Sequence, residues 1–361
     1  MTIIVFLLIL TSAVVIHELA HYLNAKSVGL PVRAFSVGMG PVLLRKQWRG
    51  TEWRLSLLPL GGYVDLPGMA AEADDDGKLY HPQEGLATKN IWEKLWVLIG
   101  GVIANYLLAV LLLAIVTSIQ PSFRGLTTGL MPAESGTIFS DVVAGSEAVD
   151  LGIEPGDRVL EINGVSSPDR TEVQRAIRND DYLELALERG DETITITSDW
   201  PPENVDAPVL GVSLEPVNFE PLPGISFPQA VAESVGFTLR IVPQTVQGFA
   251  RAFGTTLTGR RSEEVVGPVG IVGVVSEASQ AGVLPVLVVA ALINFSLAIF
   301  NLLPIPGLDG GRMLLAIVVA VRGKPFKPGQ EEMIHFVGIA VLLVFIVLVT
   351  LGEVSELIRG G

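Results

Sequence analysis

The sequence predicts a multi-pass α-helical membrane protein with about four transmembrane helices, a membrane-associated β-hairpin and an inserted extracytoplasmic α/β domain. The mean hydropathy of the 361 residues is +0.52 and only 17% of them are charged, which is too apolar for an ordinary soluble domain. Several apolar segments are long enough to cross a hydrocarbon core of about 30 Å. A polar, acidic stretch separates the second of these segments from the third.

The expected transmembrane helices occupy residues 2–23, 95–118, 281–303 and 333–351. The first lacks the basic residues that precede the apolar part of a cleavable signal peptide, so we expect the chain to retain it. The predicted parts are the first helix (1–24), a β-hairpin with a loop (25–94), the second helix (95–118), the acidic insert (119–216), an amphipathic extracytoplasmic segment (217–280), the third helix with a short helix after it (281–322), and a loop with the fourth helix (323–361).

The acidic residues are concentrated in one region, and the chain has no cysteine. Residues 119–225 contain 20 Asp and Glu against 6 Arg, a difference of −14 that equals the net charge of the whole chain. This argues against nucleic-acid binding through the insert, because phosphate contacts need Lys and Arg. Without cysteine, any bound metal needs His and carboxylate ligands.

Basic residues mark the loops that we expect in the cytoplasm. Residues 25–60 contain six Lys and Arg against one acidic residue, and residues 312–327 contain four with no acidic residue. Both loops are therefore expected on the cytoplasmic side, with the acidic insert and both chain termini outside. The C-terminal end of the first helix then lies nearer to the cytoplasm.

The first expected helix contains the motif His17-Glu18-x-x-His21. Residues four apart share one helix face, so both imidazoles can bind one Zn²⁺ at roughly 2.0–2.1 Å while Glu18 serves as general base. The alternative is a set of polar side chains that only satisfy hydrogen bonds. We favour the metal site, because these residues are costly in a lipid-facing helix without a function. His81 and His335 have no ligand-like spacing and are interpreted as incidental.

A catalytic zinc usually has three protein ligands plus water. The candidate for the third is Asp309, which follows the third expected helix after two prolines. Apart from Glu18, no other carboxylate lies within an apolar segment. The alternative is that Asp309 N-caps the short apolar helix at residues 312–321, and both roles together are also compatible with the sequence.

Residues 34–64 alternate apolar runs with turns, and residues 42–46 can pair with residues 53–58 as a hairpin. Non-helical backbone at membrane depth must be buried in protein or line a cavity. The functional interpretation is an edge strand that captures an extended substrate by strand addition. The alternative is an ordinary cytoplasmic hairpin.

Two further segments contain polar or helix-breaking residues in an apolar setting. Asn105, near Gly100 and Gly101 in the second expected helix, either joins two helices by a hydrogen bond or faces a catalytic cavity. Residues 226–253 are amphipathic at helical spacing, with a stripe that includes Leu239, and Pro243 is expected to kink or break this helix.

Taken together, these residues resemble the site-2 protease family of intramembrane zinc metalloproteases, and within it the bacterial branch of regulator-of-sigma-E proteases. The resemblance covers nearly the whole chain. It rests on the histidine motif, the stretch Pro59-Leu60-Gly61-Gly62-Tyr63-Val64, Asn105, and Asn301-x-x-Pro304 followed by Leu308-Asp309-Gly310. It implies that His17, His21 and Asp309 bind one Zn²⁺, that Glu18 is the base, and that Asn301, Asn105, Gly61 and Gly62 lie near the site or its substrate.

The acidic insert resembles a PDZ domain over residues 142–165, which read VVAGSEAVDLGIEPGDRVLEINGV. Leu210, Gly211 and Val212 resemble the peptide-binding loop of PDZ domains, displaced to the end of the insert as in circularly permuted versions. One such module is visible, whereas some relatives have two. The resemblance implies that this module binds a peptide or protein ligand, or that it restricts the access of substrates.

The resemblance implies regulated intramembrane proteolysis in a bacterial inner (plasma) membrane. The substrates would be single-pass membrane proteins, such as an anti-sigma factor, or signal-peptide remnants. A non-catalytic adaptor would be expected to lack a residue of the candidate site, and none is lacking. A metal transporter would need ionisable residues inside the second and fourth helices, whose interiors have none.

Overall fold

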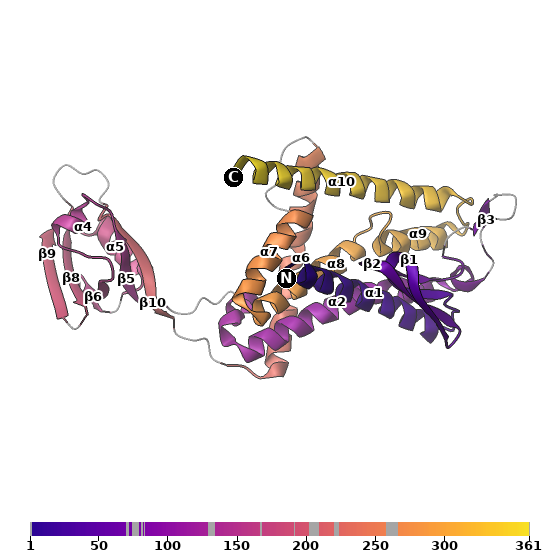
Figure 1. The fold of residues 1–361 in the computed structure, drawn as a ribbon, viewed down its shortest axis with the longest axis horizontal. Helices are drawn as coiled ribbons and strands as arrows, with labels where there is room; N and C mark the ends of the chain where they lie inside the picture. The colour runs from indigo at the N-terminus through magenta and orange to yellow at the C-terminus, as the bar shows by residue number, and fades with distance from the viewer. Residues whose placement is uncertain are drawn as a thin grey trace. The chain divides into compact units, whose positions relative to one another are not determined.

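The computed structural model divides the chain into two compact units, Met1–Ile119 with Ile225–Gly361, and Gln120–Gly224. It describes residues 2–69, 72–73, 79–80, 82, 84–128, 134–166, 168–190, 192–201, 209–219, 224–257 and 266–360. His81 lies outside the described residues. The first unit contains the long helices and the hairpin, whereas the second is built mainly of strands (Figure 1).

The helices of the first unit are α1 (Thr2–Ser27), α2 (Ile91–Ile119), α6 (Phe227–Leu257), α7 (Pro268–Ala281), α8 (Val283–Leu302), α9 (Asp309–Arg322), α10 (Gln330–Gly360) and the short 3₁₀ helix η1 (Gly85–Thr88). Within the described part of the chain, four helices are long and apolar enough to cross a membrane: α1, α2, α8 and the Gln330–Ser355 part of α10. They coincide with the four apolar segments that the sequence predicts.

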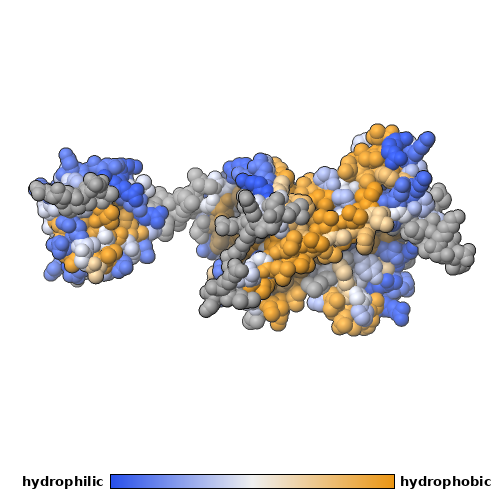
Figure 2. Space-filling view, turned by 90° about the horizontal axis from the view of Figure 1, so that it is seen from above, coloured by the Kyte–Doolittle hydropathy of each residue, from blue (hydrophilic) through white to orange (hydrophobic). Residues whose placement is uncertain are grey.

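Helix α2 lies at the centre of the first unit, where it packs against α1, α6, α8 and α9. Half of the residues in its most apolar window are buried, against 6% for α10, so most of the apolar residues of α10 are exposed or only half-buried. Figure 2 shows the resulting hydrophobic face of this unit, with hydrophilic residues gathered at its edges. Such a surface is suited to lipid rather than to water.

The hairpin consists of β1 (Ala34–Trp48) and β2 (Thr51–Asp65), joined by Arg49 and Gly50 at φ values of 50° and 76°. A two-residue turn with positive φ at both central residues has a twist that matches the twist of the strands on either side. Val42 pairs with Ser56 and Lys46 with Trp53, which confirms the predicted pairing. A further short ladder joins β3 (Glu72–Ala73) to β4 (Leu79–Tyr80).

The two long strands also fold back on each other. Residues 34–37 pair with residues 52–55 on one side and with residues 62–65 on the other. The sheet therefore has four segments, in the order 42–48, 51–56, 34–39 and 61–65. The last segment, which contains Tyr63 and Val64, forms one outer edge of this sheet.

Helix α6 continues through Pro243, so the chain does not break there. Of the predicted apolar stripe, Val242 and Val246 pack against a hydrophobic cluster that contains Phe295, whereas Leu239 is 60% exposed. Ala230, Ser234 and Thr238 are fully buried. The helix packs on α2 and α8, and Thr238 forms a hydrogen bond with Tyr106 of α2. Tertiary packing along its whole length thus compensates for the backbone hydrogen bond that a proline removes.

The second unit contains η2 (Pro121–Phe123), α3 (Arg124–Thr128), β5 (Glu134–Val142), α4 (Glu147–Asp150), β6 (Arg158–Ile162), β7 (Val165–Ser166), α5 (Arg170–Asn179), β8 (Tyr182–Arg189), β9 (Glu192–Asp199) and β10 (Val212–Phe219). Its antiparallel sheet has the order β10-β5-β6-β8-β9, with β7 paired to β6. Alternate residues Leu183, Leu185 and Leu187 of β8 are fully buried, as the period of a strand requires. Asp169 and Glu172 form a capping box at the start of α5.

One buried ion pair holds the turn before β6. Asp157 is fully buried, and Arg189 of β8 donates to both of its carboxylate oxygens at 2.7 Å. Burial raises the pKa of Asp157, but the hydrogen bonds from Arg189 and from the backbone N–H of Glu154 outweigh it and hold the pKa below its usual range. Asp157 therefore contributes stability at neutral pH, and this contribution is lost as the pH falls through its lowered pKa.

Arg189→Ala should destabilise the second unit by about 2–3 kcal/mol at neutral pH, because it leaves a buried carboxylate unpaired. The loss should shrink below about pH 4, where Asp157 becomes protonated in the variant and in the unfolded chain. Hydrogen–deuterium exchange of the β8 amides in the full chain, corrected for intrinsic rates, measures both effects. Arg158→Ala is the control, since its pair with Glu188 is exposed and should be worth less than about 1 kcal/mol. Equal losses in the two variants would contradict this assignment.

Candidate metal centre

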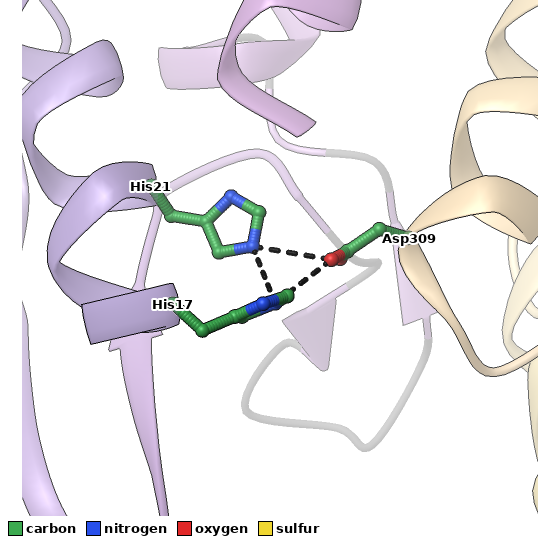
Figure 3. A group of neighbouring side chains, drawn as sticks. All are labelled: His17, His21 and Asp309. Carbon is green, nitrogen blue, oxygen red and sulfur yellow. Dashed lines mark hydrogen bonds and ion pairs between the residues drawn. The ribbon is translucent and has the colours of Figure 1, made fainter. Parts of the chain in front are cut away.

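Three side chains from distant parts of the sequence meet between α1 and the start of α9. His17 and His21 reach from α1 toward Asp309, the first residue of α9 (Figure 3). Asp309 Oδ2 lies 2.9 Å from His17 Nε2 and 3.2 Å from His21 Nε2, and the two Nε2 atoms lie 3.1 Å apart. The structure thus brings together the two motif histidines and the predicted third ligand.

The donor set fits zinc. Ligand atoms at roughly 2.0–2.1 Å from a tetrahedral Zn²⁺ lie about 3.3 Å from one another, close to the three distances found here. Two neutral imidazoles and one carboxylate are also a common set for a catalytic zinc with one open position. Burial alone would raise the pKa of Asp309, but hydrogen bonds and charges from the two histidines hold the pKa well below its usual range.

The positions of the two histidines follow from α1 and from its close contact with α2. Residues four apart project from one face, so His17 and His21 stack edge to face with ring centroids 4.7 Å apart. Gly101 of α2 lies against the ring of His17, and a Cβ at this position would overlap ring atoms. The neighbouring Gly100 likewise faces Asn24 and Ala20 of α1. Both glycines thus let α2 approach α1 closely.

Asp309 is placed by the turn before α9. The N-cap of α9 is Leu308, and no side chain forms a capping hydrogen bond, so the alternative that Asp309 is an N-cap is wrong. The carboxylate instead turns to the histidines, while its position in the first helical turn suits a negative charge. A Cβ at Gly310 or Gly311 would overlap carbonyl groups of residues 302–305, so both glycines let α9 begin close to the end of α8.

Hydrogen bonds outside the triad orient both rings. His21 Nδ1 donates to the carbonyl oxygen of Val97 at 2.8 Å, which leaves the Nε2 lone pair for a metal. His17 Nδ1 lies 3.4 Å from the side-chain amide of Asn105, which is buried on α2. Asn105 Oδ1 has no hydrogen-bond partner within the described residues, and a half-turn of the amide places this oxygen on His17 Nδ1–H.

A cavity of about 260 Å³ opens beside the triad. Its walls include Glu18, Asn301 and Arg312, together with Tyr63 and Val64 from the outer edge of the hairpin sheet. The cavity thus combines a carboxylate, an amide and a guanidinium with the three metal-binding side chains.

The two glycines predicted near the site lie in different surroundings. A Cβ at Gly62 would lie 3.6 Å from Glu18 Cγ, so this backbone packs directly on the glutamate. Gly61, with a φ of 85°, faces the side chain of Met39 and does not line the cavity. The hairpin therefore contacts the site through Gly62, Tyr63 and Val64.

His335 of α10, interpreted from its sequence spacing as incidental, contacts the turn before Asp309. His335 Nδ1 accepts a hydrogen bond from the backbone N–H of Gly307 at 2.9 Å, two residues before Asp309. Gly307 has a φ of 100°, and a Cβ at Gly338 of α10 would overlap the carbonyl of Pro306. Helix α10 thus packs against the turn before Asp309 and forms a hydrogen bond with it. This role depends on how close His335 lies to the turn at Gly307 in the folded protein, and no sequence pattern shows that proximity.

Gly101→Ala should lower the affinity for zinc and the activity together, because the added methyl group displaces the His17 ring. Alanine is otherwise a better helix former than glycine, so a loss cannot come from helix propensity. Metal content after dialysis against graded zinc buffers measures the effect. Gly273→Ala in α7 is the control, since a Cβ there meets open space. Unchanged zinc affinity in Gly101→Ala would show that the ring does not depend on this contact.

His335→Leu should weaken zinc binding, because it leaves the partly buried N–H of Gly307 without its acceptor, at a cost of about 1 kcal/mol to the Asp309 turn. His335→Asn should restore binding, since its Oδ1 can take the place of Nδ1. Zinc affinity and the cleavage rate would be measured side by side for the three proteins. Equal defects in both variants would indicate that α10 needs the ring for packing and not for its acceptor.

Comparison with known proteins agrees with this geometry. Residues 5–345 match the model of Peptidase family M50. The chain is 30% identical to a protein of Agrobacterium fabrum assigned as a zinc metalloprotease, over 98% of this chain and 95% of the relative. It is 29% identical to a protein of Nostoc with the same assignment, over 99% and 97%. It is 25% identical to zinc metalloprotease RasP of Bacillus licheniformis, over 99% of each chain.

These relatives span the chain from end to end, and the family match includes both motif histidines and Asp309. Four helices have the length and apolar composition of membrane spans. The protein therefore belongs to Peptidase family M50, the site-2 proteases, and is a zinc metalloprotease and an integral membrane protein.

Proposed function

We propose that the protein hydrolyses peptide bonds within or near transmembrane segments of single-pass membrane proteins. His17, His21 and Asp309 hold the zinc and Glu18 acts as general base. The observation that carries the proposal is that all four side chains line one cavity, and that three of them come from α1, a helix with the length and composition of a membrane span. The chemistry would then take place at membrane depth.

The side chains around the cavity suit peptide hydrolysis. Zinc, when bound, supplies a Lewis acid for the scissile carbonyl. Glu18 takes a proton from the attacking water and passes it to the leaving amine. The amide of Asn301 can donate to the oxygen on which negative charge develops. Asn105 and the carbonyl of Val97 keep the two imidazoles oriented throughout.

The outer edge of the hairpin sheet is suited to hold the substrate. Residues 61–65 form the edge segment, and Tyr63 and Val64 line the cavity beside Glu18. A transmembrane helix protects its own amides, so a substrate must unwind before cleavage. An unwound segment could then pair with this edge as an added strand, which would bring its peptide bonds past the site. This supports the capture function of the hairpin over an ordinary cytoplasmic hairpin.

The apolar exterior and the basic loops suggest how the enzyme lies in the bilayer. The exposed apolar face of α10 would contact lipid, and residues 25–60 and 312–327 would face the cytoplasm of a bacterial cell. The active site then lies toward the cytoplasmic side of the inner membrane, and the second unit lies outside. Regulated intramembrane proteolysis of an anti-sigma factor or of signal-peptide remnants fits this arrangement.

The second unit, which resembles a PDZ domain, would select substrates. Leu210, Gly211 and Val212 line a groove of about 240 Å³ together with residues of α5. A peptide or protein ligand bound in this groove, or the bulk of the unit itself, would restrict access to the protease. Substrates whose outer domain has already been trimmed would pass most easily.

Cleavage of a single-pass test substrate by the zinc-loaded protein in liposomes tests the proposal. Glu18→Gln should keep about one zinc per chain and lose at least about 100-fold in rate, because only the base is removed. Asp309→Asn should lose both zinc and activity. Glu277→Gln, a carboxylate of α7 that does not line the cavity, should behave as wild type. Equal cleavage by wild type and Glu18→Gln would refute the assignment of the base, and zinc retention by Asp309→Asn would refute that ligand.

A further inference from the structure

The groove of the second unit lies between α5 and β10. Its walls are Val209, Leu210, Gly211, Val212 and Leu214 on one side, and Arg170, Gln174, Ile177 and Arg178 of α5 on the other. Ile177 and Leu210 belong to the hydrophobic core, so the floor of the groove is apolar. Three exposed side chains of α5, spaced four residues apart, form its rim: Arg170, Gln174 and Arg178.

Strand β10 offers the backbone that a peptide needs. It is the outermost strand of the sheet and pairs with β5 on one side, and no other described strand pairs with its second side. An unpaired edge next to a groove is a site for strand addition, in which main-chain hydrogen bonds give affinity and side-chain pockets give selectivity.

The direction of α5 places Arg170 and Arg178 at opposite ends of this edge. Thr137 pairs with Pro216 in the sheet and donates to the carbonyl of Pro168, just before α5. The N-terminal end of α5 therefore lies near the end of β10 that contains Pro216. Arg178, eight residues on and about 12 Å away, lies at the Leu210–Gly211 end. An extended peptide covers this distance with about four residues at about 3.3 Å each.

Charge distinguishes this groove from its surroundings. The second unit is strongly acidic, and only six basic residues lie between residues 119 and 225. Arg158 and Arg189 are paired with acidic neighbours within the unit. Arg170 and Arg178 have no ion-pair partner among the residues that the structure describes, although both lie on the rim of the groove. Their charges are therefore available to a ligand.

We infer that this groove binds an acidic peptide, added as a strand to β10, with two carboxylates about four residues apart that meet Arg170 and Arg178. Apolar side chains between the carboxylates face Ile177 and Leu214. The carboxylate at Arg178 is either an acidic side chain or the C-terminus of the peptide. This inference rests on the proposed peptide-binding role of the second unit and adds the class of ligand.

Fluorescence anisotropy with the full, zinc-loaded chain in detergent tests the inference. The probe is a labelled peptide with the central sequence Glu-Val-Thr-Val-Glu, compared with versions that contain Gln or Lys in place of Glu. We expect the Glu peptide to bind about tenfold more tightly than the Gln peptide, and the Lys peptide to bind more weakly still. Comparison of free and amidated C-termini shows whether Arg178 contacts a terminal or a side-chain carboxylate.

Variants on one helix provide matched controls. Arg170→Glu and Arg178→Glu should each weaken the Glu peptide about tenfold and improve the Lys peptide. Arg175→Glu makes the same charge change on an exposed residue of α5 that does not line the groove, and should have less than about a twofold effect. Equal losses from Arg175→Glu and Arg178→Glu would mean that only the overall charge matters, which would overturn the inference.

The peptide series also separates this inference from the role on which it rests. Equal binding of the Glu and Gln peptides would overturn the acidic preference and leave the groove as a peptide site. Failure of all three peptides to bind would overturn both. Neither result affects the protease assignment, because cleavage of the test substrate depends on Glu18 and the zinc ligands.

Discussion

The constraint on which the first unit depends is the meeting of three side chains from α1 and α9 that could hold a metal ion, in an apolar surrounding. His17, His21 and Asp309 lie within 3.2 Å of one another although 288 residues or more separate Asp309 from the histidines. Buried polar groups of this kind are costly unless they are paired or bind a metal. Glycines permit the close packing that this arrangement needs: Gly101 of α2 lies against the ring of His17, and Gly310 and Gly311 let α9 begin close to the end of α8.

The same constraint explains why the last helix has two roles. Most of the apolar surface of α10 lies outside the protein, as expected for a helix in contact with lipid. Its first turns nevertheless contact the backbone before Asp309 through His335 and Gly338. A change in the position of α10 would therefore shift the turn that contains Gly307, and with it Asp309. The site is held by four helices and not only by the two that supply its ligands.

In the proposed function the two units divide the work of a protease between chemistry and selection. The first has a strand edge beside Glu18, and the second has a strand edge beside Arg170 and Arg178, which have no ion-pair partner among the described residues. Both edges suit extended chains, because an extended peptide can satisfy its backbone groups only by pairing with another strand. An enzyme that acts on helical substrates gains from such edges, since they favour the unwound form that can be cleaved.

The sequence alone determined the four apolar helices, the hairpin and which residues are candidates for the site. These follow from local patterns: the length of an apolar run, the spacing of His17 and His21, and the turn residues between strands. Only the tertiary structure decided where those patterns meet. It excluded Asp309 as an N-cap, kept α6 intact through Pro243, and gave roles to Gly101, Gly62 and His335, because each depends on contacts between segments far apart in the chain. Whether a glycine or a histidine matters is set by what packs against it, and no local pattern contains that information.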